Sequence, residues 1–165
     1  MIQRIQTLWI AVGITAMVLT FFFPIATLSF EWKAMPTQMN MELIPEPISF
    51  ESTSLPQNLI SMVPLIILEI LIIIIATVSI FLYKNRKLQL RVLAFAFLFS
   101  VLDLGTMFLF VDRLHDALLN EYAGIVSEAY GVAVYLPMLS IVSFLLAQRA
   151  IRKDEALIRS SERIR

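Results

Sequence analysis

The chain has 165 residues, of which 59% are hydrophobic and 16% are charged, and its mean hydropathy is +0.82. These values exclude an ordinary soluble domain and predict an integral membrane protein. The net charge is zero, cysteine is absent and His115 is the single histidine. Disulfides, iron-sulfur clusters, thiolate zinc sites and a bis-histidine haem are therefore excluded, and we expect no cofactor.

The first apolar run covers residues 8–30 and is followed by a proline-containing polar segment, residues 31–58. The run is longer than the apolar core of a secretory signal, so we expect a retained transmembrane helix in which Gly13 and Ala16 allow close helix contact. Four prolines exclude a continuous helix from the polar segment, which is predicted to be an outer loop. A two-stranded cap is the alternative, because apolar residues alternate at Leu28, Phe30, Trp32, Ile48 and Phe50.

The centre of the chain reads as a transmembrane hairpin. Residues 59–82 and 92–111 are apolar runs with one charge each, separated by the basic turn 84–91. Each run is long enough to cross the ~30 Å hydrocarbon core as a helix rising ~1.5 Å per residue. The two charges are Glu69 and Asp103, each near the middle of its run. Folding the hairpin brings the two carboxyl groups to similar depth.

The segment that follows, residues 112–128, has apolar residues at helical spacing and predicts a short amphipathic helix on or above the outer surface. Asp112, His115 and Asp116 have the i, i+3, i+4 spacing of a shared helix face, which could touch a cation. Because three polar residues on a solvated face are common and no fourth ligand is indicated, we expect no metal site.

The last apolar run covers residues 129–147, with Pro137 near its middle, and a charged tail follows at residues 149–165. The proline predicts that this helix packs inward, where a neighbouring group can satisfy the carbonyl that the proline frees. The spacing of apolar residues in the tail favours a helical continuation. That continuation either lies on the inner leaflet, docks on a partner or is simply solvated.

Basic residues determine the predicted orientation. With four crossings both termini share one side, and 11 of the 13 Lys and Arg residues fall on that side, leaving Lys33 and Arg113 opposite. By the positive-inside rule both termini are cytoplasmic. The candidate contacts for anionic lipid or a partner on this side are Lys84, Arg86, Lys87, Arg91, Arg152, Lys153 and Arg159.

These elements predict an all-α membrane protein that forms one integral membrane domain over residues 1–165. The expected fold is a four-helix transmembrane bundle with both termini cytoplasmic and a small outer loop or two-stranded cap between the first and second helices.

Three separated motifs carry a family resemblance: residues 1–7 (MIQRIQT), residues 84–89 (KNRKLQ), and the closing residues 153–160 (KDEALIRS) with 163–165 (RIR). Through them the chain resembles a bacterial domain-of-unknown-function family of small four-helix inner-membrane proteins. The resemblance implies a fold and a location in the bacterial inner membrane. It supplies no catalytic or binding residues.

The carboxyl groups of Glu69 and Asp103 are the sharpest candidate site. No cation occurs at their depth, so at least one should be protonated at neutral pH. One interpretation makes them structural, hydrogen-bonded between helices with Ser100, Thr106 or Tyr135. The other makes them a proton or cation site, as intramembrane acids often are in transporters. An intramembrane aspartyl protease is disfavoured because the usual glycine-rich motif is missing around Asp103.

We therefore expect a non-enzymatic accessory or scaffold subunit of a membrane complex. The alternative is a small proton- or cation-coupled transport protein that uses Glu69 and Asp103. The expected partners are a bilayer with an anionic inner leaflet and either a protein partner or further copies of the chain. Nucleic acid is not expected to bind.

Overall fold

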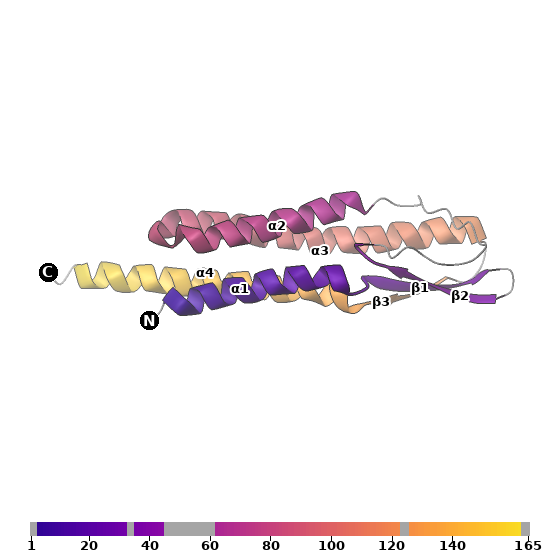
Figure 1. Cartoon of the computed structure of the whole chain (residues 1–165), viewed down its shortest axis with the longest axis horizontal. Helices are drawn as coiled ribbons and strands as arrows, with labels where there is room; N and C mark the ends of the chain where they lie inside the picture. The colour runs from indigo at the N-terminus through magenta and orange to yellow at the C-terminus, as the bar shows by residue number, and fades with distance from the viewer. Residues whose placement is uncertain (1–2, 33–34, 45–61, 123–125, 163–165) are drawn as a thin grey trace.

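The computed structural model describes residues 3–32, 35–44, 62–122 and 126–162. Four helices dominate this part of the chain, and each is long and apolar enough to cross a membrane, which confirms the four-helix prediction. They lie side by side along the long axis of the molecule (Figure 1). Their bounds are α1 (Gln3–Leu19), α2 (Val63–Phe81), α3 (Arg86–Tyr122) and α4 (Tyr135–Glu162).

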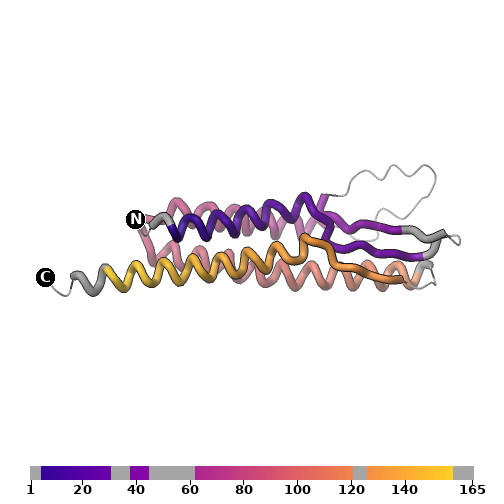
Figure 2. Tube along the Cα trace, turned by 90° about the horizontal axis from the view of Figure 1, so that it is seen from below, coloured from indigo at the N-terminus to yellow at the C-terminus, as the bar shows by residue number. Residues whose placement is uncertain are grey.

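Neighbouring helices in the bundle run in opposite directions. α1 packs mainly against α4, α3 packs against both α2 and α4, and α1 makes a lighter contact with α2. Both termini consequently lie at one end of the bundle, together with the α2–α3 turn (Figures 1 and 2). We call this the terminal end. The opposite end carries a small sheet and is called the strand end.

The sheet has three strands, β1 (Ala26–Trp32), β2 (Met35–Met41) and β3 (Ser127–Tyr130), in the order β2-β1-β3. Both pairings are antiparallel. A strand at Leu28 to Trp32 was among the predictions, but its partner differs: β1 pairs with β2, while Ile48 and Phe50 lie outside the described residues. The third strand comes from a segment that we expected to be helical.

The first helix is shorter than the apolar run that predicts it. α1 ends at Leu19, a 3-10 turn η1 (Thr20–Phe22) follows, and Phe23 is already extended. Pro24 explains the change, because a proline disfavours helical backbone in the residue before it. The apolar residues of β1 therefore continue as a strand and pack into the core rather than facing lipid.

The third helix is longer than predicted. α3 has 37 residues, about 55 Å at 1.5 Å per residue, so it continues from the membrane run through most of the segment 112–128. That segment is not a separate surface helix. Its residues Leu114 and Leu118 are buried against the sheet, because the same apolar stripe that packs inside the bundle carries on beyond it.

The fourth helix is displaced toward the C-terminus relative to the prediction. Residues 127–130 form β3, a 3-10 turn η3 (Val132–Val134) follows, and α4 begins at Tyr135. Pro137 is thus in the first turn, where it removes no helical hydrogen bond and causes no kink. The helix runs on into the charged tail, where Ile151 and Asp154 are buried. This part of the tail belongs to the bundle.

Two clusters of buried apolar residues form the core. One lies at the strand end and joins the sheet to α2, α3 and the 3-10 turn η3 that precedes α4. The other fills the bundle toward the terminal end and includes Ile10, Ile72 and Phe144. Gly13 lies directly against the Phe144 ring, so the predicted close helix contact at this glycine is confirmed.

Candidate functional site

Two groups of buried polar residues lie at different levels of the bundle. The first level holds Glu69 and Asp103, which we call the carboxyl pair. The second level, at the terminal end, holds Gln6, Arg86 and Asp154, which we call the terminal network. All of these residues except Arg86 are buried, with 0% to 5% of their surface exposed. Polar groups are expensive to bury, so both levels are candidates for function.

The carboxyl pair stands on two apolar stripes. On α2 the buried positions run Leu65, Glu69, Ile72, and on α3 Asp103 is followed one turn later by buried Met107. Spacings of three and four residues keep such positions on one helix face, so both carboxyl groups point into the bundle. Their four oxygens are buried and have no hydrogen-bond partner within the described part of the chain.

The two carboxyl groups are close enough to interact electrostatically, and Thr20 faces Glu69 from the end of α1. The Thr20 hydroxyl donates its single proton to the Met17 carbonyl at 2.5 Å. It can therefore only accept a hydrogen bond from Glu69, and only if Glu69 carries a proton. Among the residues that the structure describes, no cation forms an ion pair with either acid.

The polar side chains that we expected to hold the carboxyl pair do not hold it. The Ser100 hydroxyl donates to the Ala96 carbonyl at 2.9 Å, and the Thr106 hydroxyl donates to the Leu102 carbonyl at 2.8 Å. Both protons are used within α3. Tyr135 is 61% exposed and is not part of this interior site. The interpretation in which these residues hydrogen-bond the pair between helices thus loses the Ser100 and Thr106 hydroxyls as donors.

The carboxyl pair lies at the middle of the apolar span of α3 and somewhat toward the strand end of the apolar span of α2. Glu69 is in the second turn of α2, about 9 Å along the helix from Val63 and about 22 Å from Lys84 at the other limit of the apolar span. Thr20 marks the same level on α1, where that helix ends. The carboxyl pair therefore sits beneath the sheet, between the two apolar clusters.

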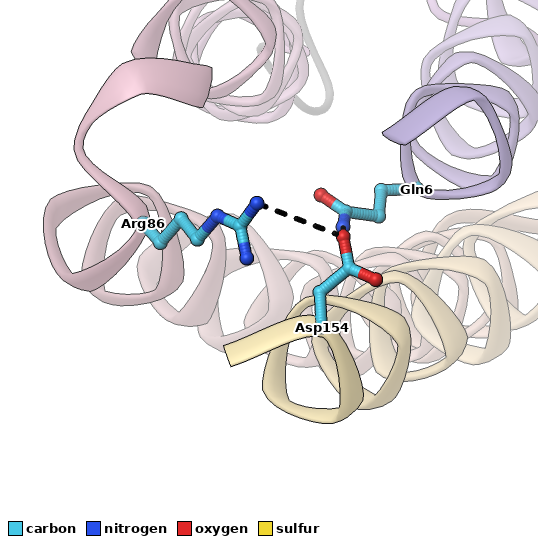
Figure 3. A network of polar contacts seen from close by, with 3 residues as sticks. All are labelled: Gln6, Arg86 and Asp154. Atoms are coloured by element: carbon cyan, nitrogen blue, oxygen red, sulfur yellow. Dashed lines mark hydrogen bonds and ion pairs between the residues drawn. The ribbon is translucent and has the colours of Figure 1, made fainter. Parts of the chain in front are cut away.

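The terminal network joins three helices through one carboxylate. Asp154 Oδ2 on α4 accepts a hydrogen bond from Gln6 Nε2 on α1 at 2.6 Å. The same oxygen lies 4.0 Å from Arg86 Nη2 at the start of α3. Figure 3 shows Gln6 and Arg86 directed toward Asp154 from their separate helices. The network therefore links the two ends of the chain to the α2–α3 turn.

A capped turn places Arg86 in this position. The 3-10 turn η2 (Leu82–Lys84) ends α2, and the Asn85 N–H donates to the Leu82 carbonyl at 2.9 Å. Asn85 then caps α3, because its Oδ1 accepts from the Leu88 N–H at 3.4 Å and its carbonyl accepts from the Gln89 N–H at 2.9 Å. Arg86 is consequently the first residue of α3.

A cavity of about 530 Å³ opens beside the network. It is lined by Gln6, Thr7, Leu8, Ala11, Ile80, Tyr83, Arg86 and Gln89. Two of the polar atoms in its lining residues, Arg86 Nη1 and Gln89 Oε1, are buried and have no hydrogen-bond partner within the described ranges. The guanidinium thus turns one nitrogen to Asp154 and keeps another uncommitted.

The basic residues predicted to contact lipid or a partner are mostly exposed. Arg86 differs because it is partly buried within the terminal network, and the Arg159 side chain lies outside the described residues. The exposed ones form a basic surface at the terminal end: Lys84, Lys87, Arg91, Arg152 and Lys153.

Acidic residues occupy the strand end. Asp112 and Asp116 are exposed on α3, and Glu128 Oε2 lies 3.4 Å from His115 Nδ1. Partial burial, with the charges of Glu128 and Asp112, raises the pKa of the Tyr130 phenol. Over the described ranges, no three potential ligands come together in a group that could hold a metal ion.

Gln6, Gln89 and Asp154 were not singled out from the sequence. A signal was present for them: Asp154 follows buried Ile151 by three residues, and Gln89 precedes buried Leu93 by four. Each is therefore a polar residue in register with an apolar stripe. Gln6 carries the same signal, since it precedes buried Ile10 by four residues, but its partner Asp154 is 148 residues away and could not be predicted.

The three motifs behind the family resemblance meet in this network. Residues 1–7 supply Gln6, residues 84–89 supply Arg86 and Gln89, and residues 153–160 supply Asp154. Comparison with curated proteins finds no match. The family model described as "Domain of unknown function (DUF4293)" matches residues 2–164, so this multi-pass membrane protein belongs to the DUF4293 family.

Proposed function

We propose that this protein is a non-enzymatic accessory or scaffold subunit of a complex in the bacterial inner membrane. The observation that carries the proposal is the division of charge between two ordered ends. The terminal end presents the exposed cations Lys84, Lys87, Arg91, Arg152 and Lys153, and the strand end presents the exposed acids Asp112, Asp116 and Glu128 with one exposed cation, Arg113, among these described residues. Charged, structured surfaces on both sides of a membrane suit a protein that holds partners in register.

The proposed orientation places the terminal end in the cytoplasm, because cations are retained on that side. Cysteine labelling can test it cleanly, since the chain has no native cysteine. Ser127→Cys and Ala156→Cys are exposed, uncharged positions at opposite ends. An impermeant maleimide should label Ser127→Cys in intact spheroplasts and Ala156→Cys only after permeabilisation. The reverse pattern would overturn the orientation.

The accessory role is tested by purifying the full chain from native membranes in mild detergent and identifying what remains bound. We expect a stoichiometric protein partner, and we expect the double variant Arg152→Gln and Lys153→Gln to lose it. The matched control is Lys84→Gln with Lys87→Gln, which removes the same charge from the same end. A chain that purifies only as a homogeneous homo-oligomer would contradict the accessory role.

A second function, proton- or cation-coupled transport, is favoured by the carboxyl pair. Four buried carboxyl oxygens without partners among the described residues form a place where a proton or cation could be held. One chain of four helices offers little room for alternating access, so this function would require an oligomer. Wild-type protein in liposomes should then show pH-dependent flux, and Glu69→Gln with Asp103→Asn should abolish it while preserving the fold. Liposomes without flux exclude this function.

A further inference from the structure

The cavity at the terminal end has an amphipathic lining. Arg86, Gln89 and Gln6 contribute polar atoms, while Leu8 and Ile80 contribute apolar surface. A small soluble ion would contact only the first group. The lining therefore fits a ligand that has a polar head and an apolar body.

The polar wall of the cavity holds buried polar atoms that have no hydrogen-bond partner within the described residues. Gln89 is 2% exposed, and its Oε1 has no partner within the described part of the chain. Arg86 Nη1 is likewise buried and unpaired there, while Nη2 lies toward Asp154. A guanidinium with a free N–H edge is well suited to a phosphate oxygen, and a buried amide oxygen needs a donor.

An apolar path continues from the cavity along α1. A second cavity of about 290 Å³ shares Leu8 and Ala11 with the first and reaches Leu19 and Leu139. The distance from Leu8 to Leu19 along the helix is about 16 Å, which is roughly half of a ~30 Å hydrocarbon core. The path thus has the depth of one leaflet.

Charge identifies the head group. Lys84 and Lys87 are exposed on either side of Arg86 in the same turn, so the mouth of the cavity is electropositive. We infer that this cavity binds one anionic phospholipid, with its phosphate at Arg86, a hydroxyl or ammonium donor of its head group at Gln89, and an acyl chain along α1. Basic pockets between transmembrane helices commonly hold such lipids. This binding does not require the accessory role.

Native mass spectrometry of the delipidated full chain, titrated with phosphatidylglycerol or phosphatidylcholine, tests the inference. Arg86→Gln should weaken phosphatidylglycerol binding about tenfold and remove the preference over phosphatidylcholine. Lys87→Gln removes the same charge from the same turn without touching the cavity, and should change binding less than threefold. Equal losses in the two variants would overturn the site, because they would show attraction by the basic surface alone.

The apolar half is tested with the charges intact. Ala11 lines both cavities, so Ala11→Phe should fill part of their space and weaken the binding of both lipids about tenfold. Val18→Phe adds the same ring to α1 outside both cavities and should leave lipid binding unchanged. Wild-type binding by Ala11→Phe would overturn the acyl seat. Inorganic phosphate that displaces the lipid fully would reduce the cavity to an anion site. If Arg86→Gln fails to fold, the Ala11 and Val18 pair decides alone.

Discussion

Removing the Glu69 carboxyl should make the protein more stable. The side chain is fully buried, and both of its oxygens lack a hydrogen-bond partner among the described residues. A buried neutral polar group without a partner costs roughly 1–3 kcal/mol. Methionine has a similar shape and no such cost, so Glu69→Met should raise the free energy of unfolding by about 1–3 kcal/mol. At about 2–4 °C per kcal/mol, the Tm should rise by roughly 2–12 °C.

The assay is thermal unfolding of the detergent-purified protein followed by near-ultraviolet circular dichroism. Leu65→Met is the matched control, because Leu65 is buried one turn away on the same face of α2. A volume-conserving change there should cost less than about 1.5 kcal/mol. If Glu69→Met is less stable than Leu65→Met, the carboxyl group stabilises the native state, and the reasoning from its unpaired oxygens is refuted.

The outcome also bears on the two functions. A stabilising Glu69→Met would mean that the chain keeps an acid at the expense of stability, which is the usual pattern at functional sites. Transport through the carboxyl pair would then become the stronger proposal. A destabilising result would instead support a structural role between α2 and α3.

Two other substitutions test the elements that hold the ends of the bundle together. A Cβ at Gly131 would collide with the backbone carbonyl of Pro24. Gly131→Ala should therefore lower the free energy of unfolding by about 2–5 kcal/mol, through overpacking and loss of the backbone hydrogen bonds that join residues 131 and 133 to Ile25 and Pro24. The control is Gly105→Ala, whose Cβ meets nothing within 4 Å and which should be neutral or slightly stabilising in the same melting assay. Asp154→Asn should cost about 1–3 kcal/mol by stripping Arg86 of its counter-charge, and adding Arg86→Met should recover part of that loss; a double-mutant cycle showing no coupling would contradict the ion pair.

Local patterns in the sequence were sufficient for the membrane architecture. Four apolar runs of spanning length predict four helices, and an even number of crossings puts both termini at one end, as the structure has them. The similar depth of Glu69 and Asp103 also followed from the hairpin, because it needs only helical period and one turn. These properties depend on composition and on neighbours close in sequence.

Only the tertiary structure decided where each helix ends and what its polar residues contact. The apolar residues of β1 are compatible with a transmembrane helix as well as with a strand. They form a strand because β1 pairs with β2 and β3. Gln6 meets Asp154 across 148 positions, beyond the reach of any local pattern. The terminal network and its cavity arise from such distant contacts, because packing in three dimensions sets which polar groups share an interior.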